Sequence, residues 1–194
     1  MMDIILASTS PYRRALLERL KLDFRCIPPD VDEKHQPGEP PGALAERLAR
    51  AKAQAVADLH PDALVIGSDQ VASIDSQILG KPGNFDAARA QLTLSSGREV
   101  LFYTGVALVS RGRNFERFHV EPFAVRFRAL SATHIANYLQ REQPYDCAGS
   151  FKAEGLGIAL FERLAGNDPT SLEGLPLIAL CGLLTEAGVE ILGR

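Results

Sequence analysis

The 194-residue sequence predicts an α/β fold built around a mixed β-sheet. Short apolar segments with strand character alternate with segments of helical periodicity, which is typical of α/β proteins. Two long strand-like segments, 99–110 and 115–128, flank the turn "SRGRN", so at least these neighbouring strands run antiparallel. A chain of this length can form one domain with a sizeable core, or two lobes that share one.

The predicted elements alternate along the chain. In order they are strand 3–7, helix 12–20, strand 23–28, loop 28–42, helix 42–59, strand 62–69, hairpin 71–80, helix 84–96, strands 99–110 and 115–128, helix 131–142, strand-like segment 149–164 and helix 175–187. The first strand, "DIILA", is short and apolar, and the first helix has Ser10 as its N-cap and Pro11 in its first turn. The polar, proline-rich loop 28–42 has a length that is usually functional or mobile.

The middle and the end of the chain also contain short sequence patterns that indicate helices and strands. Helix 42–59 has the clearest apolar stripe, and strand "DALVIGSD" ends in the carboxylate of Asp69. Ser131 is the N-cap of helix 131–142. The segment "GSFKAEGLGIALFERL" is interrupted by glycines and has strand character. The apolar run from Leu175 to Leu184 is about ten residues long, too short to span a bilayer, and is expected to be a core helix.

Composition excludes several classes of partner. Apolar residues make up 46% and charged residues 23%, and the net charge is −3, so no overall basic field attracts a nucleic acid polymer or an anionic membrane. The three cysteines, Cys26, Cys147 and Cys181, lack metal-ligand spacing, and we expect reduced thiols in a cytoplasmic protein. The start "MMDIILAS" lacks the features of a signal peptide.

The stretch "STSPYRR" predicts an anion site. The N–H groups at a helix start favour negative charge, and the guanidinium groups of Arg13 and Arg14 match phosphate oxygens. The two arginines point about 100° apart on a helix, so they would contact different oxygens. The competing interpretation is a solvated helix start, although cations are disfavoured at that end of a helix.

Lys52 and Asp69 are the next candidates. Lys52 lies in the apolar stripe of helix 42–59, so it either extends to water or points from the core into a polar cleft. Asp69, at the expected carboxyl end of its strand, can hold a metal or accept a proton from water, although a turn or cap role is more common. Glu33 could supply a second carboxylate, but Asp30 and Asp32 could do so instead.

Lys81 in "GKP" is presented by a rigid glycine-proline turn. Together, several cations, two or more carboxylates and a helix N-terminus fit a triphosphate with bound Mg²⁺. The chain lacks the "GxxxxGK" and "GxGxxG" phosphate motifs and the zinc motifs "HExxH" and "CxxC", so none of those known sites is present.

A set of short motifs, distributed nearly from end to end, carries a family resemblance. They are "LASTSPYRRALL", "DEK" at 32–34, "LARAKAQAV", "IGSDQV", "LGKP", "QLTLSSG", "YTGVAL", "DCAGSFKAEGLGI" and "GLPL". In this order they resemble the Maf family of nucleoside triphosphate pyrophosphatases. The resemblance implies a Maf/Ham1-like (ITPase-like) fold, in which a twisted mixed sheet with flanking helices forms one domain over 1–194, with two lobes around a central cleft.

The resemblance also implies a homodimer, a divalent cation (Mg²⁺, Mn²⁺ or Co²⁺) and roles for individual residues. Asp69 would be the proton acceptor, or would ligate the metal together with Glu33. The residues expected to hold the substrate phosphates are Ser8, Arg13, Arg14, Lys52 and Lys81.

Within the family, the chain is most similar to the branch that hydrolyses 7-methyl-GTP to 7-methyl-GMP and pyrophosphate. The branch that acts on dTTP and UTP usually has Asp-Thr in place of Asp69-Gln70, and "IQG" in place of residues 153–155. Tyr12 departs from the branch pattern, in which this position is usually Trp. Tyr12, Gln70 and Glu154 are therefore expected to contact the cationic base, for which an aromatic face and a carboxylate are suited; otherwise Tyr12 packs in the core and Glu154 is solvated.

Two other functions remain open at this point. One is a broader house-cleaning pyrophosphatase that acts on dTTP, UTP or other modified nucleotides. The other is a non-catalytic nucleotide-binding regulator of cell division, which would not need both the metal carboxylates and Asp69.

Overall fold

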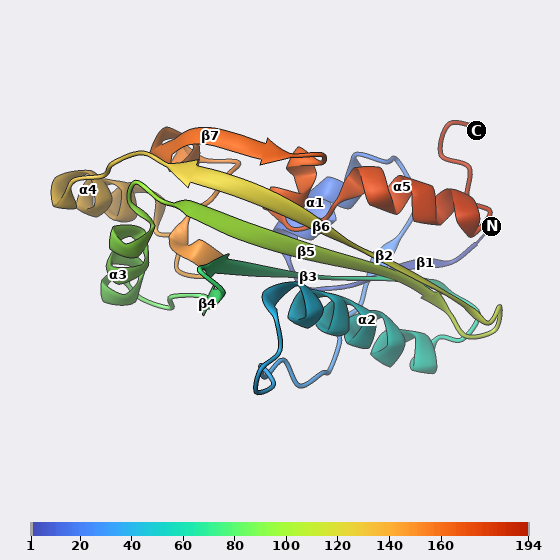
Figure 1. The fold of residues 1–194 in the computed structure, drawn as a ribbon. Coiled ribbons are helices and arrows are strands. Elements are labelled where there is room, and N and C mark those ends of the chain that lie inside the picture. Colours follow the sequence, from blue (N-terminus) through green and yellow to red (C-terminus); the bar gives the residue numbers. More distant parts are fainter. Residues whose placement is uncertain (1, 194) are drawn as a thin grey trace.

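The computed structural model describes residues 2–193 and shows an elongated α/β molecule with one mixed β-sheet (Figure 1). The strands are β1 (Ile4–Ala7), β2 (Arg25–Cys26), β3 (Leu64–Ile74), β4 (Gln77–Leu79), β5 (Glu99–Ser110), β6 (Phe115–Phe127) and β7 (Phe161–Gly166). Their order is β2-β1-β3-β5-β6-β7, with β4 paired to β3. The pairs of β1 with β2 and with β3 are parallel, and the remaining pairs are antiparallel, so the predicted mixed sheet is confirmed.

The helices are α1 (Pro11–Glu18), α2 (Pro41–Leu59), α3 (Phe85–Ser95), α4 (Ala132–Glu142) and α5 (Leu177–Glu186), with short 3-10 turns η1 (Ala148–Ser150), η2 (Leu156–Leu160) and η3 (Pro169–Glu173). Three of the five described helices begin with a side-chain cap, whereas α2 and α5 begin after Pro40 and Pro176 without one. The side chains of Ser10, Asn84 and Ser131 each accept a backbone N–H from the first turn of their helix. Within residues 2–193, no helix combines the length and the apolar character that crossing a membrane requires.

Two helical layers cover opposite faces of the sheet. Successive side chains of a strand point to opposite faces, and the buried residues of β3 and β5 divide accordingly. Leu64 and Ile66 belong to a cluster with α1 and α5, whereas Val65 belongs to a cluster with α2. Figure 1 shows α2 and α5 on either side of the central strands.

Helix α2 approaches the sheet closely because two glycines face it. A Cβ on Gly67 would lie 2.3 Å from Ala49 O, and one on Gly105 would lie 2.4 Å from Ala45 O. Any larger residue at either position would push the helix outward. This close contact brings the middle of α2, where Lys52 lies, over the middle of β3.

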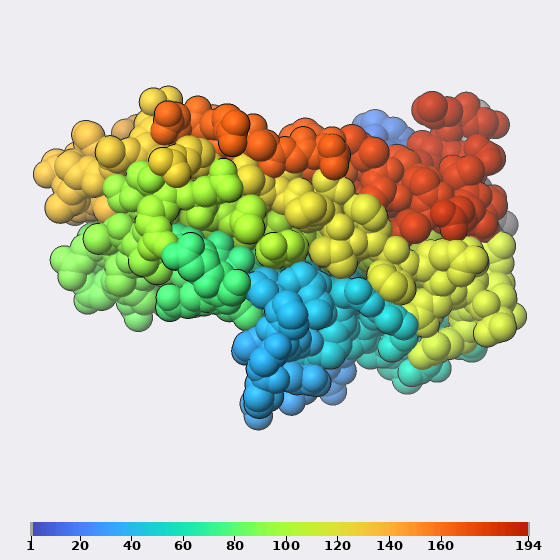
Figure 2. Space-filling view, in the orientation of Figure 1, coloured from blue at the N-terminus to red at the C-terminus, as the bar shows by residue number. Residues whose placement is uncertain are grey.

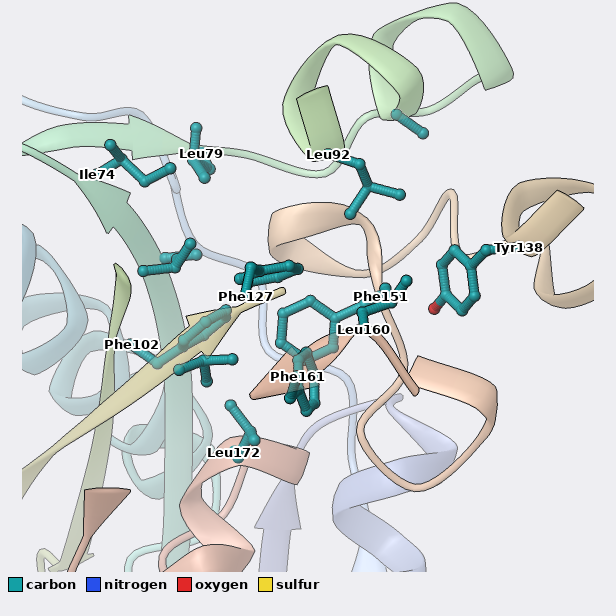
Figure 3. Packing of buried hydrophobic residues seen from close by; sticks show 14 of the residues in the cluster. Ile74, Leu79, Leu92, Phe102, Phe127, Tyr138, Phe151, Leu160, Phe161 and Leu172 are labelled. Atoms are coloured by element: carbon teal, nitrogen blue, oxygen red, sulfur yellow. The ribbon is translucent and has the colours of Figure 1, made fainter. Parts of the chain in front are cut away.

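The far end of the sheet has a separate aromatic core. Phe102, Phe127, Phe151 and Phe161 pack edge to face, with ring centroids 4.8–5.7 Å apart (Figure 3). Each such pair stabilises the fold by about 0.5–1.5 kcal/mol beyond the burial of its surface. Helices α3 and α4 lie side by side over this end, and the termini lie at the opposite end (Figure 1).

Two sequence predictions were wrong. β3 does not stop at Asp69 but continues to Ile74 and turns through Asp75 and Ser76, both at positive φ, into β4. The segment 149–164 is not a strand over most of its length: it forms η1, a loop and η2 before β7 begins at Phe161. The loop is tight because Gly157 approaches Lys152 O so closely that a Cβ would lie only 2.2 Å away.

Candidate functional site

The site lies where one edge of β3 is left open. β1 pairs with β3 only as far as Gly67, and β4 begins to pair at Ala72. Between these two positions, at residues 68–71, no described strand covers that edge. A cavity of about 630 Å³ opens there, and it is lined by residues from the loop before α1, from α2, from β3 and from the aromatic end of the sheet.

Asp69, Lys52 and Glu33 meet in this cavity. Asp69 points to the α2 face of β3, and Lys52 Nζ donates to Asp69 Oδ1 at 2.6 Å and lies 2.7 Å from Glu33 Oε1. Lys52 and Asp69 are only 6% and 8% exposed. Of the two interpretations of Lys52, the structure therefore supports the one in which it points from the core into a polar cleft. It also selects Glu33 over Asp30 and Asp32 as the carboxylate in the cavity.

Glu33 is held in its charged form by the surrounding cations. Burial alone would raise the pKa of Glu33, but the hydrogen bond from Lys52 and the charges of Lys52, Lys81 and Arg13 lower it below its ordinary value. A carboxylate that stays ionised beside three cations is suited to a site that binds a metal-bound polyanion.

The loop that carries Glu33 is anchored to α2 by a second ion pair. Glu39 accepts two hydrogen bonds from Arg47, at 2.6 and 2.8 Å, and Arg47 also donates to Lys34 O. The Arg47 hydrogen bond lowers the pKa of Glu39 to about 2. In Figure 2, the light-blue chain that leads into α2 projects from the body of the molecule.

Arg13 is fixed by a backbone carbonyl from a distant part of the chain. Its Nε donates to Gly174 O at 2.8 Å, and the buried hydroxyl of Ser68 lies 2.9 Å from the same oxygen. Gly174 adopts φ +110°, which favours glycine. Arg13 lines the cavity, and with Nε engaged its two terminal nitrogens remain available to a ligand. Burial lowers the pKa of Arg13, whereas the charges of Asp69 and Glu33 raise it.

The other predicted phosphate residues differ in their placement. Ser8 is buried, lines the cavity and accepts a hydrogen bond from Ser10 N. Lys81 is exposed and also lines the cavity. Arg14 is not brought to the site: it lies on the outer side of α1, is 65% exposed and pairs with Glu18. We therefore leave Arg14 out of the proposed phosphate site.

Gln70 lines the cavity from the opposite face of β3. Its Nε2 donates to Ser171 O at 2.8 Å, to Leu172 O at 3.1 Å and to Thr104 Oγ1 at 3.2 Å. This side chain therefore ties η3 to the sheet, a role that the sequence did not reveal. Its carbonyl oxygen remains as the group that could contact a ligand.

Tyr12 and Glu154 lie together at the other end of the cavity, with Asp146 and Cys147. Burial raises the pKa of Tyr12, so its phenol is neutral at physiological pH. Burial also raises the pKa of Cys147 to about 12, so this thiol stays protonated at physiological pH. The cavity thus has one end rich in cations and another with an aromatic ring and two carboxylates, beside which lies the cation of Lys152.

Sequence reasoning missed several residues that shape this site. Gly174 occurs in the motif "GLPL", but nothing in the sequence indicates that its carbonyl fixes Arg13. The Glu39–Arg47 pair is equally hidden, because long-range contacts leave no local pattern. Asp146 occurs in the motif "DCAG" and could have been noted as a second acidic residue near Glu154.

The sequence profile described as "Maf: Maf-like protein" matches residues 3–187. The chain belongs to the Maf-like protein family. A Maf-like relative from Colwellia psychrerythraea strain 34H, named 7-methyl-GTP pyrophosphatase, is 54% identical over 194 residues, which cover 100% of this chain and 97% of the relative. Relatives of the same name from Pseudomonas fluorescens and Pseudomonas syringae pv. tomato are 54% and 53% identical, with 98% of this chain covered in each case and 99% and 100% of the relatives.

Solved structures similar to this Maf-like chain are more distant in sequence. The Staphylococcus aureus Ham1 protein is 16% identical with a TM-score of 0.47, over 66% of this chain and 72% of that protein. Protein VC0702 from Vibrio cholerae is 11% identical with a TM-score of 0.49, over 96% of this chain and 98% of that protein.

Proposed function

We propose that this protein hydrolyses 7-methyl-GTP to 7-methyl-GMP and pyrophosphate. The observation that carries the proposal is the contact of Lys52 with both Asp69 and Glu33 in a cleft that also contains Arg13 and Lys81. The family assignment and the relatives at 53–54% identity support the same reaction. In this reaction, water attacks the α-phosphorus and pyrophosphate leaves.

The cations at one end of the cleft suit the phosphate chain. The free nitrogens of Arg13 and the ammonium groups of Lys52 and Lys81 stabilise the negative charge that develops on the phosphoryl oxygens. The Ser8 hydroxyl donates to the same chain. Because contacts with the protein hold Arg13 and Lys52 before the substrate arrives, these two groups need little reorganisation in the transition state.

Asp69 is proposed as the group that accepts the proton from the attacking water. Its position in the middle of β3 makes it rigid, and its Lys52 partner orients one carboxylate oxygen and leaves the other for water. The alternative role, as a metal ligand, remains compatible with the same geometry.

A divalent cation fits the donor set of the cleft. Among the described residues, no group of three or more His, Cys, Asp or Glu side chains could hold a metal by itself. Mg²⁺ is typically bound by one or two carboxylates together with substrate phosphates and water. Glu33 and Asp69 therefore fit as the protein ligands, and the bound cation would supply charge neutralisation at the phosphates.

The opposite end of the cleft suits a positively charged base. Tyr12 presents an aromatic face, to which a cation is attracted by about 0.5–2 kcal/mol. Glu154 offers a carboxylate that can accept hydrogen bonds from the guanine edge, and Gln70 offers its amide oxygen. These groups distinguish 7-methyl-GTP from nucleotides with uncharged bases by charge as well as by shape.

The test is pyrophosphate release from a panel of 7-methyl-GTP, GTP, dTTP and UTP, with Mg²⁺, Mn²⁺ and Co²⁺ in parallel. With H₂¹⁸O as solvent, attack at the α-phosphorus places the label in 7-methyl-GMP and none in pyrophosphate. We expect the highest kcat/KM for 7-methyl-GTP. Equal rates on dTTP and UTP would favour the broader house-cleaning function, and binding without turnover would favour a nucleotide-binding regulator.

Two further properties belong to the same proposal. We expect a cytoplasmic protein, consistent with the absence of a disulfide among its three described cysteines. We also expect a homodimer, and the exposed apolar side chains of Phe118 and Ile178 are candidates for such a contact. Light scattering across a concentration series tests the oligomeric state.

A further inference from the structure

The loop that carries Glu154 into the cleft is held by the last two turns of α4. Lys152 N donates to the hydroxyl of the buried Tyr138 at 3.1 Å, and Leu156 N donates to Glu142 Oε2 at 2.8 Å. These two anchors lie two residues before and two residues after Glu154. Glu154 itself forms no hydrogen bond or ion pair with any other described residue, so its position depends on the loop.

Glu142 fits this loop closely. A Cβ on Gly155 would lie 2.9 Å and 3.0 Å from the two carboxylate oxygens of Glu142, so the absence of a side chain there makes room for the carboxylate. The main-chain oxygen of Glu142 accepts a hydrogen bond from Lys152 Nζ at 3.4 Å. Glu142 therefore contacts the loop on both sides of Glu154.

We propose that Glu142 is a positioning residue that sets the discrimination between 7-methyl-GTP and GTP by holding Glu154 against the base. This inference rests on the proposed function. Glu142 is absent from the residues that line the cleft, so it acts through the loop rather than by contact with the nucleotide. What matters is the reach of its side chain to Leu156 N, not its charge.

Two conservative variants separate the effect of the length of the Glu142 side chain from the effect of its charge. Glu142→Gln keeps the length and an acceptor oxygen and loses the charge, whereas Glu142→Asp keeps the charge and is one methylene shorter. We expect Glu142→Gln to retain the wild-type ratio of kcat/KM for 7-methyl-GTP over GTP. We expect Glu142→Asp to lower this ratio by about threefold to tenfold, the effect of one lost hydrogen bond, with kcat/KM for GTP nearly unchanged.

The matched control is Arg141→Ala, because Arg141 is the exposed neighbour of Glu142 in the same helical turn. It should leave the ratio unchanged. A double variant, Glu142→Asp with Glu154→Gln, should be no less selective than Glu154→Gln alone, because one residue acts through the other. Hydrogen exchange at the Leu156 amide should be faster in Glu142→Asp and unchanged in Glu142→Gln.

Three results would overturn the inference. If the wild type prefers 7-methyl-GTP and Glu142→Asp keeps that preference, only the role of Glu142 fails. If Glu142→Asp lowers kcat/KM equally for both nucleotides, Glu142 is structural and not selective. If the wild-type enzyme shows no preference between the two nucleotides, the proposed function fails and this inference fails with it.

Discussion

Lys52 Nζ lies 2.6 Å from Asp69 Oδ1, and this contact joins α2 to the open edge of β3 inside the cleft. The pair is buried, so each charge depends on the other. Lys52→Met should lower the free energy of unfolding by about 3 kcal/mol, because it leaves the Asp69 carboxylate without its cation. Pyrophosphate release should fall by at least about 100-fold, since the phosphate site loses a fixed charge.

The double variant Lys52→Met with Asp69→Leu separates these two effects. It removes both buried charges, so most of the lost stability should return while activity stays absent. Thermal or urea unfolding beside a pyrophosphate assay measures both. If activity returned together with stability, the pair would be structural only.

Gly174 holds Arg13 through its carbonyl oxygen, at a φ of +110°. Gly174→Ala should shift this carbonyl and release the guanidinium, so that KM for the nucleotide rises about tenfold with a smaller change in kcat. Gly188, at φ +82°, lies after α5 and outside the cleft, so Gly188→Ala introduces similar backbone strain as a control. Equal effects of the two substitutions on KM would show that Gly174 does not position Arg13.

The fold was predictable where signals are local. Ser10 before α1 and Ser131 before α4 each accept a backbone N–H from the first turn of the helix, and Pro11 suits the first helical position, so the sequence alone locates those two starts. The hairpin of β5 and β6 was predictable from two long strand-like segments around one turn.

The errors have a common physical reason, which is that tertiary contacts stabilise what local patterns disfavour. The polar run Ser68-Asp69-Gln70 resembled a strand end, but each side chain has a partner in the folded protein. Ser68 donates to Gly174 O, Asp69 accepts from Lys52 of α2, and Gln70 donates to a backbone oxygen of η3. The segment 149–164 resembled a strand because it is rich in apolar residues, and its sequence does not show that Gly157 packs closely against Lys152 O in a tight loop. Arg14 resembled a phosphate ligand, but the orientation of α1 directs it to solvent.

The Glu39–Arg47 pair should contribute stability that depends on pH. Because the pKa of Glu39 is lowered to about 2, its charged form stabilises the fold above its ordinary pKa of 4.5, and this contribution is lost as pH falls toward 2. Glu39→Gln should therefore be less stable than the wild type by up to about 1 kcal/mol at pH 7. The difference should vanish in urea melts near pH 2, and a difference that does not change with pH would contradict the assignment.

Tyr12 should set how strongly the cleft prefers a cationic base. Tyr12→Trp enlarges the aromatic face and should raise the ratio of kcat/KM for 7-methyl-GTP over GTP by about twofold to fivefold. Tyr12→Leu removes the ring and should lower the same ratio. GTP serves as the internal control, because its base carries no positive charge. If neither substitution changed the ratio, Tyr12 would pack against the protein and not against the base.

The most direct test of the account is pyrophosphate release from 7-methyl-GTP by Asp69→Asn beside the wild type. The amide keeps the shape of the side chain but cannot accept a proton from water at neutral pH. We expect turnover to fall to background while circular dichroism shows an intact fold, with a lower unfolding midpoint because Lys52 loses one of its two carboxylate partners. Wild-type turnover in a folded Asp69→Asn protein would contradict the claim that this cleft carries out the hydrolysis through Asp69.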